Sequence, residues 1–126
     1  MRQALIPGAP IVLWVSVFGP RGMRGVYGLL DTGAAFVTIP LQDAIDLGDD
    51  LRSAPLQRVT TANGVIRAPK ITLSRVRLAE LEAVDVPALC LDLPGSPTAA
   101  LIGMNLISRF NVTLDATHRE LRINAP

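Results

Sequence analysis

The sequence predicts an all-β fold, a small barrel or sandwich that also carries two short helices. Short runs of β-prone and apolar residues are separated by Gly, Pro and Asn along most of the chain, the pattern of short strands joined by tight turns. With 126 residues, 49% of them hydrophobic, the chain can bury one core without disulfides or metals. We find no internal repeat, linker or low-complexity segment, so residues 1–126 are expected to form a single domain.

Several segments satisfy the strand pattern, and two of the turns between them are recognisable. The expected strands are Ile11–Phe18, Val26–Leu30, Gln57–Thr61, Val65–Leu78, Val84–Leu91, Asn111–Leu114 and Glu120–Ile123. The glycine-rich GPRGMRG, Gly19–Gly25, lacks the spacing of a nucleotide-binding loop and is expected to be a mobile hairpin turn. Asn63-Gly64 is typical of a type I′ hairpin turn, in which both central residues need positive φ.

Two stretches have the pattern of short helices. In PLQDAIDLG, Pro40 suits a first turn, Leu41, Ala44 and Ile45 share one face, and Gly48 suits the end. In GMNLISRFN, which begins at Gly103, the apolar residues Leu106, Ile107 and Phe110 are expected to point inward, and the helix ends near Asn111.

Composition excludes several classes of function. The net charge is +1, and the eleven arginines are scattered from Arg2 to Arg122, so nothing favours a nucleic acid or an anionic membrane as a partner. No stretch approaches the roughly 20 apolar residues of a membrane helix. The early apolar run IVLWVSVF lacks the small-residue cleavage site of a signal peptide. A cytoplasmic protein is therefore expected.

The side chains that usually hold metals or catalyse thiol chemistry are scarce. Cys90 is the only cysteine and His118 the only histidine, which rules out a disulfide or a His/Cys zinc site within one chain. Cys90 is expected in the core and His118 in a solvated turn. The aspartates of residues 43–50 lack the order of a calcium loop and are expected to line a solvated helix face. We expect no metal and no cofactor.

An aspartate at the end of an apolar strand needs a physical explanation. In GLLDTGAAFVTIP the chain passes from a predicted strand directly to Asp31, and Gly33 permits a tight turn there. A buried carboxylate without a partner costs several kcal/mol. The simplest explanation is an Asx turn, in which Asp31 accepts hydrogen bonds from the backbone amides that follow it.

The whole pattern resembles the retropepsin-like aspartic proteases, the single-domain relatives of pepsin. Asp31-Thr32-Gly33-Ala34 resembles the catalytic loop of that family. About 70 residues later, ALIGMNLISRF (Ala100–Phe110) resembles its second signature, and VTTANGVIRAP (Val59–Pro69) stands where the family has a flap hairpin. The resemblance covers Ile11–Ile123 and implies a small closed pepsin-like barrel with a flap.

The resemblance also implies roles for individual residues. Asp31 would be the catalytic carboxylate, Thr32 would tie together the catalytic loops of a homodimer, and Gly33 would let the substrate backbone approach. The substrate-binding positions it implies are Ala34 and Ala35 of the loop, Asn63, Gly64 and Val65 of the flap, and Ile102 of the second signature.

The implied function is an aspartic endopeptidase acting on a polypeptide, with Asp31 of two chains forming one dyad. The chain has one Asp-Thr-Gly, so the second carboxylate must come from a second copy. An ion pair common in viral members is absent, since its positions hold Ala35 and Met104. Two alternatives remain: a catalytically silent dimerisation or peptide-binding module of the same fold, and an unrelated barrel that binds a ligand.

Overall fold

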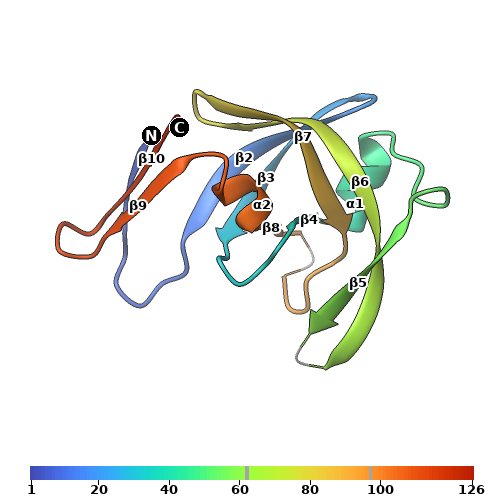
Figure 1. Ribbon diagram of the computed structural model, residues 1–126, viewed down its shortest axis with the longest axis horizontal. Helices are drawn as coiled ribbons and strands as arrows, with labels where there is room; N and C mark the ends of the chain where they lie inside the picture. The colour runs from blue at the N-terminus through green and yellow to red at the C-terminus, as the bar shows by residue number, and fades with distance from the viewer. Residues whose placement is uncertain (62, 97) are drawn as a thin grey trace.

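The computed structural model describes residues 1–61, 63–96 and 98–126, and its elements are mostly strands (Figure 1). In chain order they are β1 (Arg2–Ala4), β2 (Val12–Gly19), β3 (Gly22–Leu30), β4 (Val37–Ile39), α1 (Leu41–Asp46), β5 (Leu56–Thr61), β6 (Gly64–Leu78), β7 (Leu81–Cys90), β8 (Ala100–Ile102), α2 (Met104–Ile107), β9 (Asn111–Asp115) and β10 (Glu120–Asn124). No helix in the described ranges has the length and apolar character needed to span a membrane.

Six strands close into a barrel, which confirms the expected all-β fold. The hydrogen-bonded order is β2-β3-β8-β4-β7-β6, and β6 pairs again with β2. The pairs β3–β8 and β4–β7 are parallel, whereas β2–β3, β2–β6, β4–β8 and β6–β7 are antiparallel. Alternating residues of these strands, such as Leu13, Val15 and Val17 of β2, fill the interior, because successive side chains of a strand point to opposite faces.

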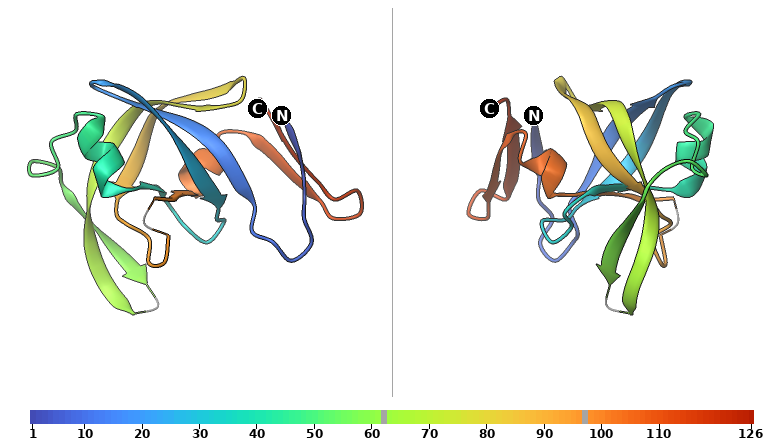
Figure 2. Two further views of the ribbon diagram at one scale, coloured as in Figure 1. Left: turned by 180° about the vertical axis from the view of Figure 1, so that it is seen from behind. Right: turned by 45° about the vertical axis from the view of Figure 1, so that its right-hand side comes forward.

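Two groups of strands lie outside this ring. β5 pairs only with the first half of β6, so the β5–β6 hairpin projects beyond the barrel (Figure 1). At the opposite end, β1, β10 and β9 form a separate three-stranded sheet that brings the chain termini together, as both views of Figure 2 show. Its inner residues Leu121 and Ile123 join the barrel core.

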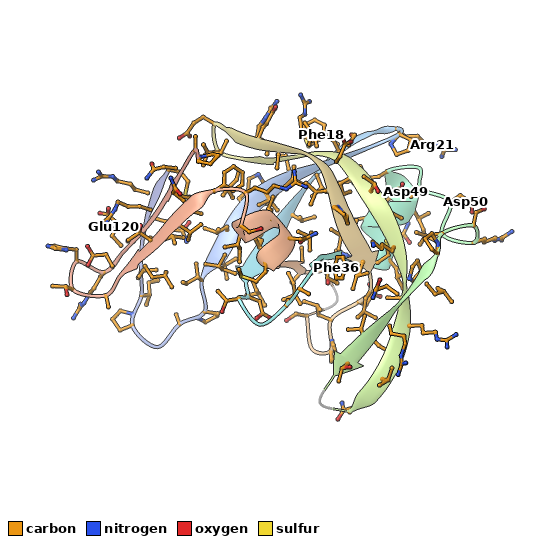
Figure 3. All side chains as sticks on the ribbon, viewed as in Figure 1. Phe18, Arg21, Phe36, Asp49, Asp50 and Glu120 are labelled. Carbon is orange, nitrogen blue, oxygen red and sulfur yellow. The ribbon has the colours of Figure 1, made fainter. Side chains whose placement is uncertain are left out.

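The β2–β3 hairpin is longer and its turn tighter than the sequence suggested. Gly19 pairs with Gly22, so only two residues connect the strands, and Met23 to Gly25 belong to β3 instead of a loop. The tip is anchored, since the Arg21 N–H donates to the carbonyl of Leu47 at 2.8 Å. Figure 3 shows Arg21 above α1 and Asp49. The turn expected over Gly19–Gly25 is therefore shorter than predicted, since most of these residues belong to β2 and β3.

The predicted helices are present but shorter, and three strands were not predicted. The missing strands β1, β4 and β8 have three residues each, too few for a period to be visible in the sequence.

The expected burial of Cys90 is confirmed, and His118 is exposed with its Nδ1 2.7 Å from Oδ2 of Asp115. Within the described residues no group of three His, Cys, Asp or Glu side chains is placed to hold a metal ion.

Candidate active site

Asp31 lies at the end of β3 in a loop that fixes its backbone and one carboxylate oxygen. Its N–H donates to the carbonyl of Ile102 at 3.0 Å, which continues the parallel pairing of β3 with β8. Its Oδ1 accepts the Gly33 N–H at 2.9 Å, and its carbonyl accepts the Ala34 N–H at 3.2 Å. The Asx turn considered from the sequence is therefore present. In the single chain Asp31 is only half-buried.

The start of α2 holds the other side of this loop. The Met104 N–H donates to the carbonyl of Ala34 at 2.7 Å, and the Asn105 N–H donates to that of Ala35 at 3.1 Å. Gly103 makes this approach possible, because a Cβ there would lie 2.5 Å from the carbonyl carbon of Phe36 and 2.9 Å from the carbonyl oxygen of Ala34. The two segments that the sequence marked are thus in direct contact.

Asn105 completes this connection and was not singled out from the sequence. Its Oδ1 accepts the Val37 N–H at 2.8 Å, and its Nδ2 donates to the carbonyl of Pro87 at 2.7 Å. The amide therefore links the start of β4, directly after the Asp31 loop, to β7 in a partly buried position. Asparagine is a poor helix former, so its place in the first turn of a predicted helix was the available signal.

A groove of about 770 Å³ opens beside Asp31. Its walls come from the loop after β3, the β5–β6 hairpin, the segment after β7, and β8. The β5–β6 hairpin and the loops after β3 and β7 extend toward the lower side of Figure 1. The lining residues are Asp31, Gly33, Ala34, Ala35, Phe36, Thr38, Gln57, Arg58, Val59, Thr60, Asn63, Ile66, Leu89, Leu91, Asp92, Leu93, Pro94 and Leu101. The lining is largely aliphatic, which suits a groove for apolar side chains of a ligand.

Of the site residues that the sequence suggested, five line this groove and four do not. Asp31, Gly33, Ala34, Ala35 and Asn63 line it. Thr32 is exposed at the tip of the loop, outside the groove.

Two further residues that were expected to bind substrate, Val65 and Ile102, do not line the groove of the single chain. Val65 is 53% exposed and lies on the outer face, whereas its neighbour Ile66 faces the groove, because adjacent residues of a strand alternate. Ile102 is 3% exposed and packs against Gly28 in the core, and the neighbouring Leu101 is the groove residue. In both cases the residue that lines the groove is the immediate neighbour of the expected one.

The position of Gly64 in the hairpin also differs from the expectation. Gly64 pairs with Thr61 and is the first residue of β6, with φ of 120°, so it belongs to the strand and not to the centre of the turn. Gly64 does not line the groove. The turn type expected for Asn63-Gly64 depends on the conformation around Ala62, which lies outside the described residues.

Phe36 and Asp92 are groove residues that the sequence did not indicate. Lys70 Nζ lies 5.1 Å from the centroid of the Phe36 ring, a cation–π contact at the base of the hairpin, and Figure 3 places Phe36 near the middle of the molecule. Asp92 Oδ1 accepts the Leu41 N–H at 3.0 Å and so caps the start of α1 from the segment after β7. Neither role has a local sequence signal.

Comparisons with known proteins agree with this geometry. The family model for aspartyl proteases matches residues 16–106, which include both the Asp31 loop and the start of α2. A search of curated proteins finds no match. Among solved structures, the fold is similar to the crystal structure of a retropepsin-like aspartic protease from Rickettsia conorii. The TM-score is 0.71 at 23% sequence identity, and the match covers 98% of this chain and 88% of that one.

The family match spans most of the chain and contains the half-buried aspartate, the glycine that lets α2 approach it, and the barrel strands that carry both. We conclude that the chain belongs to the aspartyl protease family and has a fold similar to that of a retropepsin-like aspartic protease.

Proposed function

We propose that the protein is an aspartic endopeptidase whose active site forms between two copies of the chain. The observation that carries the proposal is the position of Asp31, which lies in a rigid loop at a largely apolar groove and occurs in the only Asp-Thr-Gly of the sequence. A twofold axis beside this loop would bring the partner's Asp31 against it. Thr32, exposed at the loop tip, is then available to contact the second copy.

The chemistry follows from two carboxylates at hydrogen-bond distance. Two such groups in a site of low dielectric share one proton, and aspartic proteases are the best-known example of this arrangement. The charged carboxylate takes a proton from water as the water attacks the carbonyl, and the neutral one donates to the carbonyl oxygen. The half-exposed carboxylate of the single chain would become buried and partnered in the dimer.

The groove and the hairpin supply the remaining requirements of a peptidase. An extended peptide can lie along the groove with apolar side chains against Phe36, Leu91 and Leu101. The β5–β6 hairpin, which includes Asn63, forms the wall opposite Asp31 and would act as the flap. Among the described strands, β5 pairs only with β6, and such a hairpin is suited to open and close over substrate.

The alternative is a catalytically silent module that dimerises or binds peptides. The Asx turn favours it to a degree, because the hydrogen bond to the Gly33 N–H gives Asp31 a structural role that needs no catalysis. The two functions differ in one measurable respect, since only the peptidase cleaves the peptides that it binds.

The test is an Asp31→Asn substitution combined with subunit mixing. The variant should dimerise and lose activity by on the order of 10³-fold, because the loop keeps its shape and loses the ionisable group. Asp85→Asn is the matched control, since Asp85 is exposed on β7 with φ of 52° and does not line the groove. Random exchange of wild-type and Asp31→Asn chains should leave an equal mixture with about a quarter of full activity.

The mixing curve distinguishes the functions. A fall with the square of the wild-type fraction supports one site built from two chains, whereas a fall in simple proportion would show that each chain holds its own site. Peptide binding without any cleavage across pH 4–9 would contradict the peptidase and support the catalytically silent module. An active dyad should give a bell-shaped pH profile displaced to the acid side of neutrality, because the shared proton is present only between its two ionisations.

A further inference from the structure

The outer face of the β2–β3 hairpin carries an exposed aromatic pair. Trp14 and Tyr27 are cross-strand partners with ring centroids 4.7 Å apart and planes at 68°, and they are 54% and 61% exposed. The indole of Trp14 covers Gly25, where a Cβ would lie 2.7 Å from its Cη2 and 2.9 Å from its Cε2. Because Gly25 has no side chain, the indole of Trp14 can lie directly against it. The exposed ring is therefore held in place before any ligand arrives.

A second cavity, of about 420 Å³, lies beside this pair and is bordered by carboxylates. Pro40, Gln42 and Asp43 line it from the start of α1, and Asp92 lines it from the segment after β7. We call it the outer pocket. Two aromatic rings on one side and two carboxylates on another are the chemistry that recognises an organic cation.

Among the described residues, neither carboxylate of the outer pocket forms an ion pair with a cationic side chain, although Asp92 Oδ1 accepts the Leu41 N–H. The neighbouring guanidinium of Arg24 is engaged by Asp46, and within the described residues the Asp43 carboxylate has no hydrogen bond or ion pair. Partial burial raises the pKa of Asp43; Arg24 opposes this shift, whereas Asp46 and Asp92 add to it. A cation placed beside Asp43 would remove that unfavourable interaction.

The outer pocket and the groove are neighbours, because Asp92 lines both cavities. A peptide that leaves the groove past Asp92 would therefore come to the side of the outer pocket that holds Trp14 and Tyr27. The occupant that fits this position and charge is a side chain of that same peptide.

We propose that the outer pocket binds a lysine or arginine side chain of the polypeptide substrate, at a position outside the residues that flank the scissile bond. The proposal rests on the proposed function, since it assumes that the groove holds a polypeptide. It adds a specificity that the largely apolar groove does not supply: a basic residue a few positions from the cleaved bond.

The experiment measures binding separately from cleavage. Trp14 is the only tryptophan of the chain, so its fluorescence reports directly on the outer pocket. Peptides with one apolar core and a lysine, norleucine or glutamate at each flanking position in turn are titrated into Asp31→Asn protein, which leaves them intact. At one flanking position lysine should bind about tenfold more tightly than norleucine and change the Trp14 emission. Glutamate should bind more weakly than both.

Matched variants locate the effect. In the Asp31→Asn background, Asp43→Asn should remove most of the tenfold preference for lysine, whereas Asp85→Asn, which deletes the same charge away from both cavities, should retain it. Trp14→Leu, followed by anisotropy of a labelled peptide, should also remove it. With wild-type protein, lysine at the same position should lower KM by a similar factor.

The outcomes separate this proposal from the proposed function. Equal binding of the lysine and norleucine peptides at every position overturns the outer pocket while cleavage stands. Preferential lysine binding that depends on Asp43, without cleavage of any peptide by wild-type protein, overturns the peptidase and supports the pocket. A change of Trp14 emission with protein concentration alone would show that a second copy covers this face, and would overturn the proposal.

Discussion

The loop that carries Asp31 and the hairpin that faces it across the groove are held in opposite ways. The loop is bonded on both sides, to β8 through Asp31 and to α2 through Ala34 and Ala35. The hairpin is bonded on one side only, because β5 has no neighbour other than β6 among the described strands. Local opening is easiest where few contacts must break, so we expect the hairpin to open more readily than the loop.

One glycine in each region illustrates the difference between the closely packed loop and the projecting hairpin. Gly103 has an ordinary φ of −90° and no room for a side chain, whereas Gly64 has a φ of 120° and open space, with nothing within 4 Å of the point that a Cβ would occupy. The first is required by packing and the second by backbone conformation. A chemical group that must stay in place is supported by packing, and a segment that admits a ligand is shaped mainly by its own backbone.

Gly103→Ala should have the largest effect. The new methyl group would meet the carbonyls of Phe36 and Ala34, so the loop and α2 must separate, which destabilises the fold by about 3 kcal/mol. Urea unfolding of the variant and wild type measures the change. Activity per folded chain should also fall, because Asp31 moves with its loop. Wild-type stability in this variant would show that α2 does not hold the loop tightly.

Asn105→Ala should come next, at about 2 kcal/mol. It leaves the Val37 N–H and the Pro87 carbonyl without their partners in a partly buried position. Asn105→Asp is the informative companion, since it keeps the acceptor for Val37 and loses the donor to Pro87. If both variants have the same urea midpoint of unfolding as the wild type, water replaces the amide without loss of stability. The link that Asn105 makes to β7 would then contribute little to the free energy of unfolding.

Gly64→Ala should have a smaller effect on stability and a clearer one on turnover. A residue with a Cβ at this φ is strained by about 1 kcal/mol, and the strain is confined to the tip of a hairpin that projects from the barrel. Peptidase assays should show a higher KM and a lower kcat together, as for a gating segment. A large loss of stability with normal kinetics would mean that the hairpin belongs to the rigid part of the fold.

Cys90 reports whether opening of the hairpin spreads into the barrel. Burial, with a smaller contribution from Asp49, raises the pKa of this thiol to about 12 from 9.0. The folded protein should therefore resist iodoacetamide at pH 8, and Gly64→Ala should not change the rate. Gly103→Ala should increase it, since Cys90 lies at the end of β7 beside β4. Fast alkylation in both variants would mean that the two walls open together.

The same thiol makes the stability of the fold depend on pH above about 9. The unfolded chain ionises Cys90 near pH 9 and the folded chain only near 12, so unfolding releases a proton in between. Its contribution to stability is complete below pH 9 and declines as the pH rises toward 12. Comparison of wild type with Cys90→Ala by urea unfolding at pH 8 and pH 10 isolates this effect, and parallel changes in the two proteins would contradict it.

The differences between the expectations from the sequence and the structure are of one kind. Ile66 lines the groove where Val65 was expected to bind substrate, Leu101 lines it in place of Ile102, and Gly64 pairs with Thr61 where it was expected at the centre of the turn. A strand exchanges its two faces when its register moves by one residue, and the register of these strands is set by their partners in the sheet. The strands β4 and β8 were missed for the same reason, because three residues acquire a strand conformation only by pairing with β7 and β3.

What the sequence determined by itself depends on residues close together in the chain. Asp31-Thr32-Gly33, the β-prone runs with their Gly and Pro turns, and the start of α2 after Gly103 are local patterns, and they sufficed to predict the fold class, the family and the catalytic candidate. Only the tertiary structure decided that Asn105 holds the loop, that Leu101 faces the groove, and that Asp92 lies between two cavities. These side chains act on segments at least 18 positions away in several cases, as with Asn105 and Pro87. Such contacts form only when the barrel closes, since chain entropy keeps these segments apart until the strands pair.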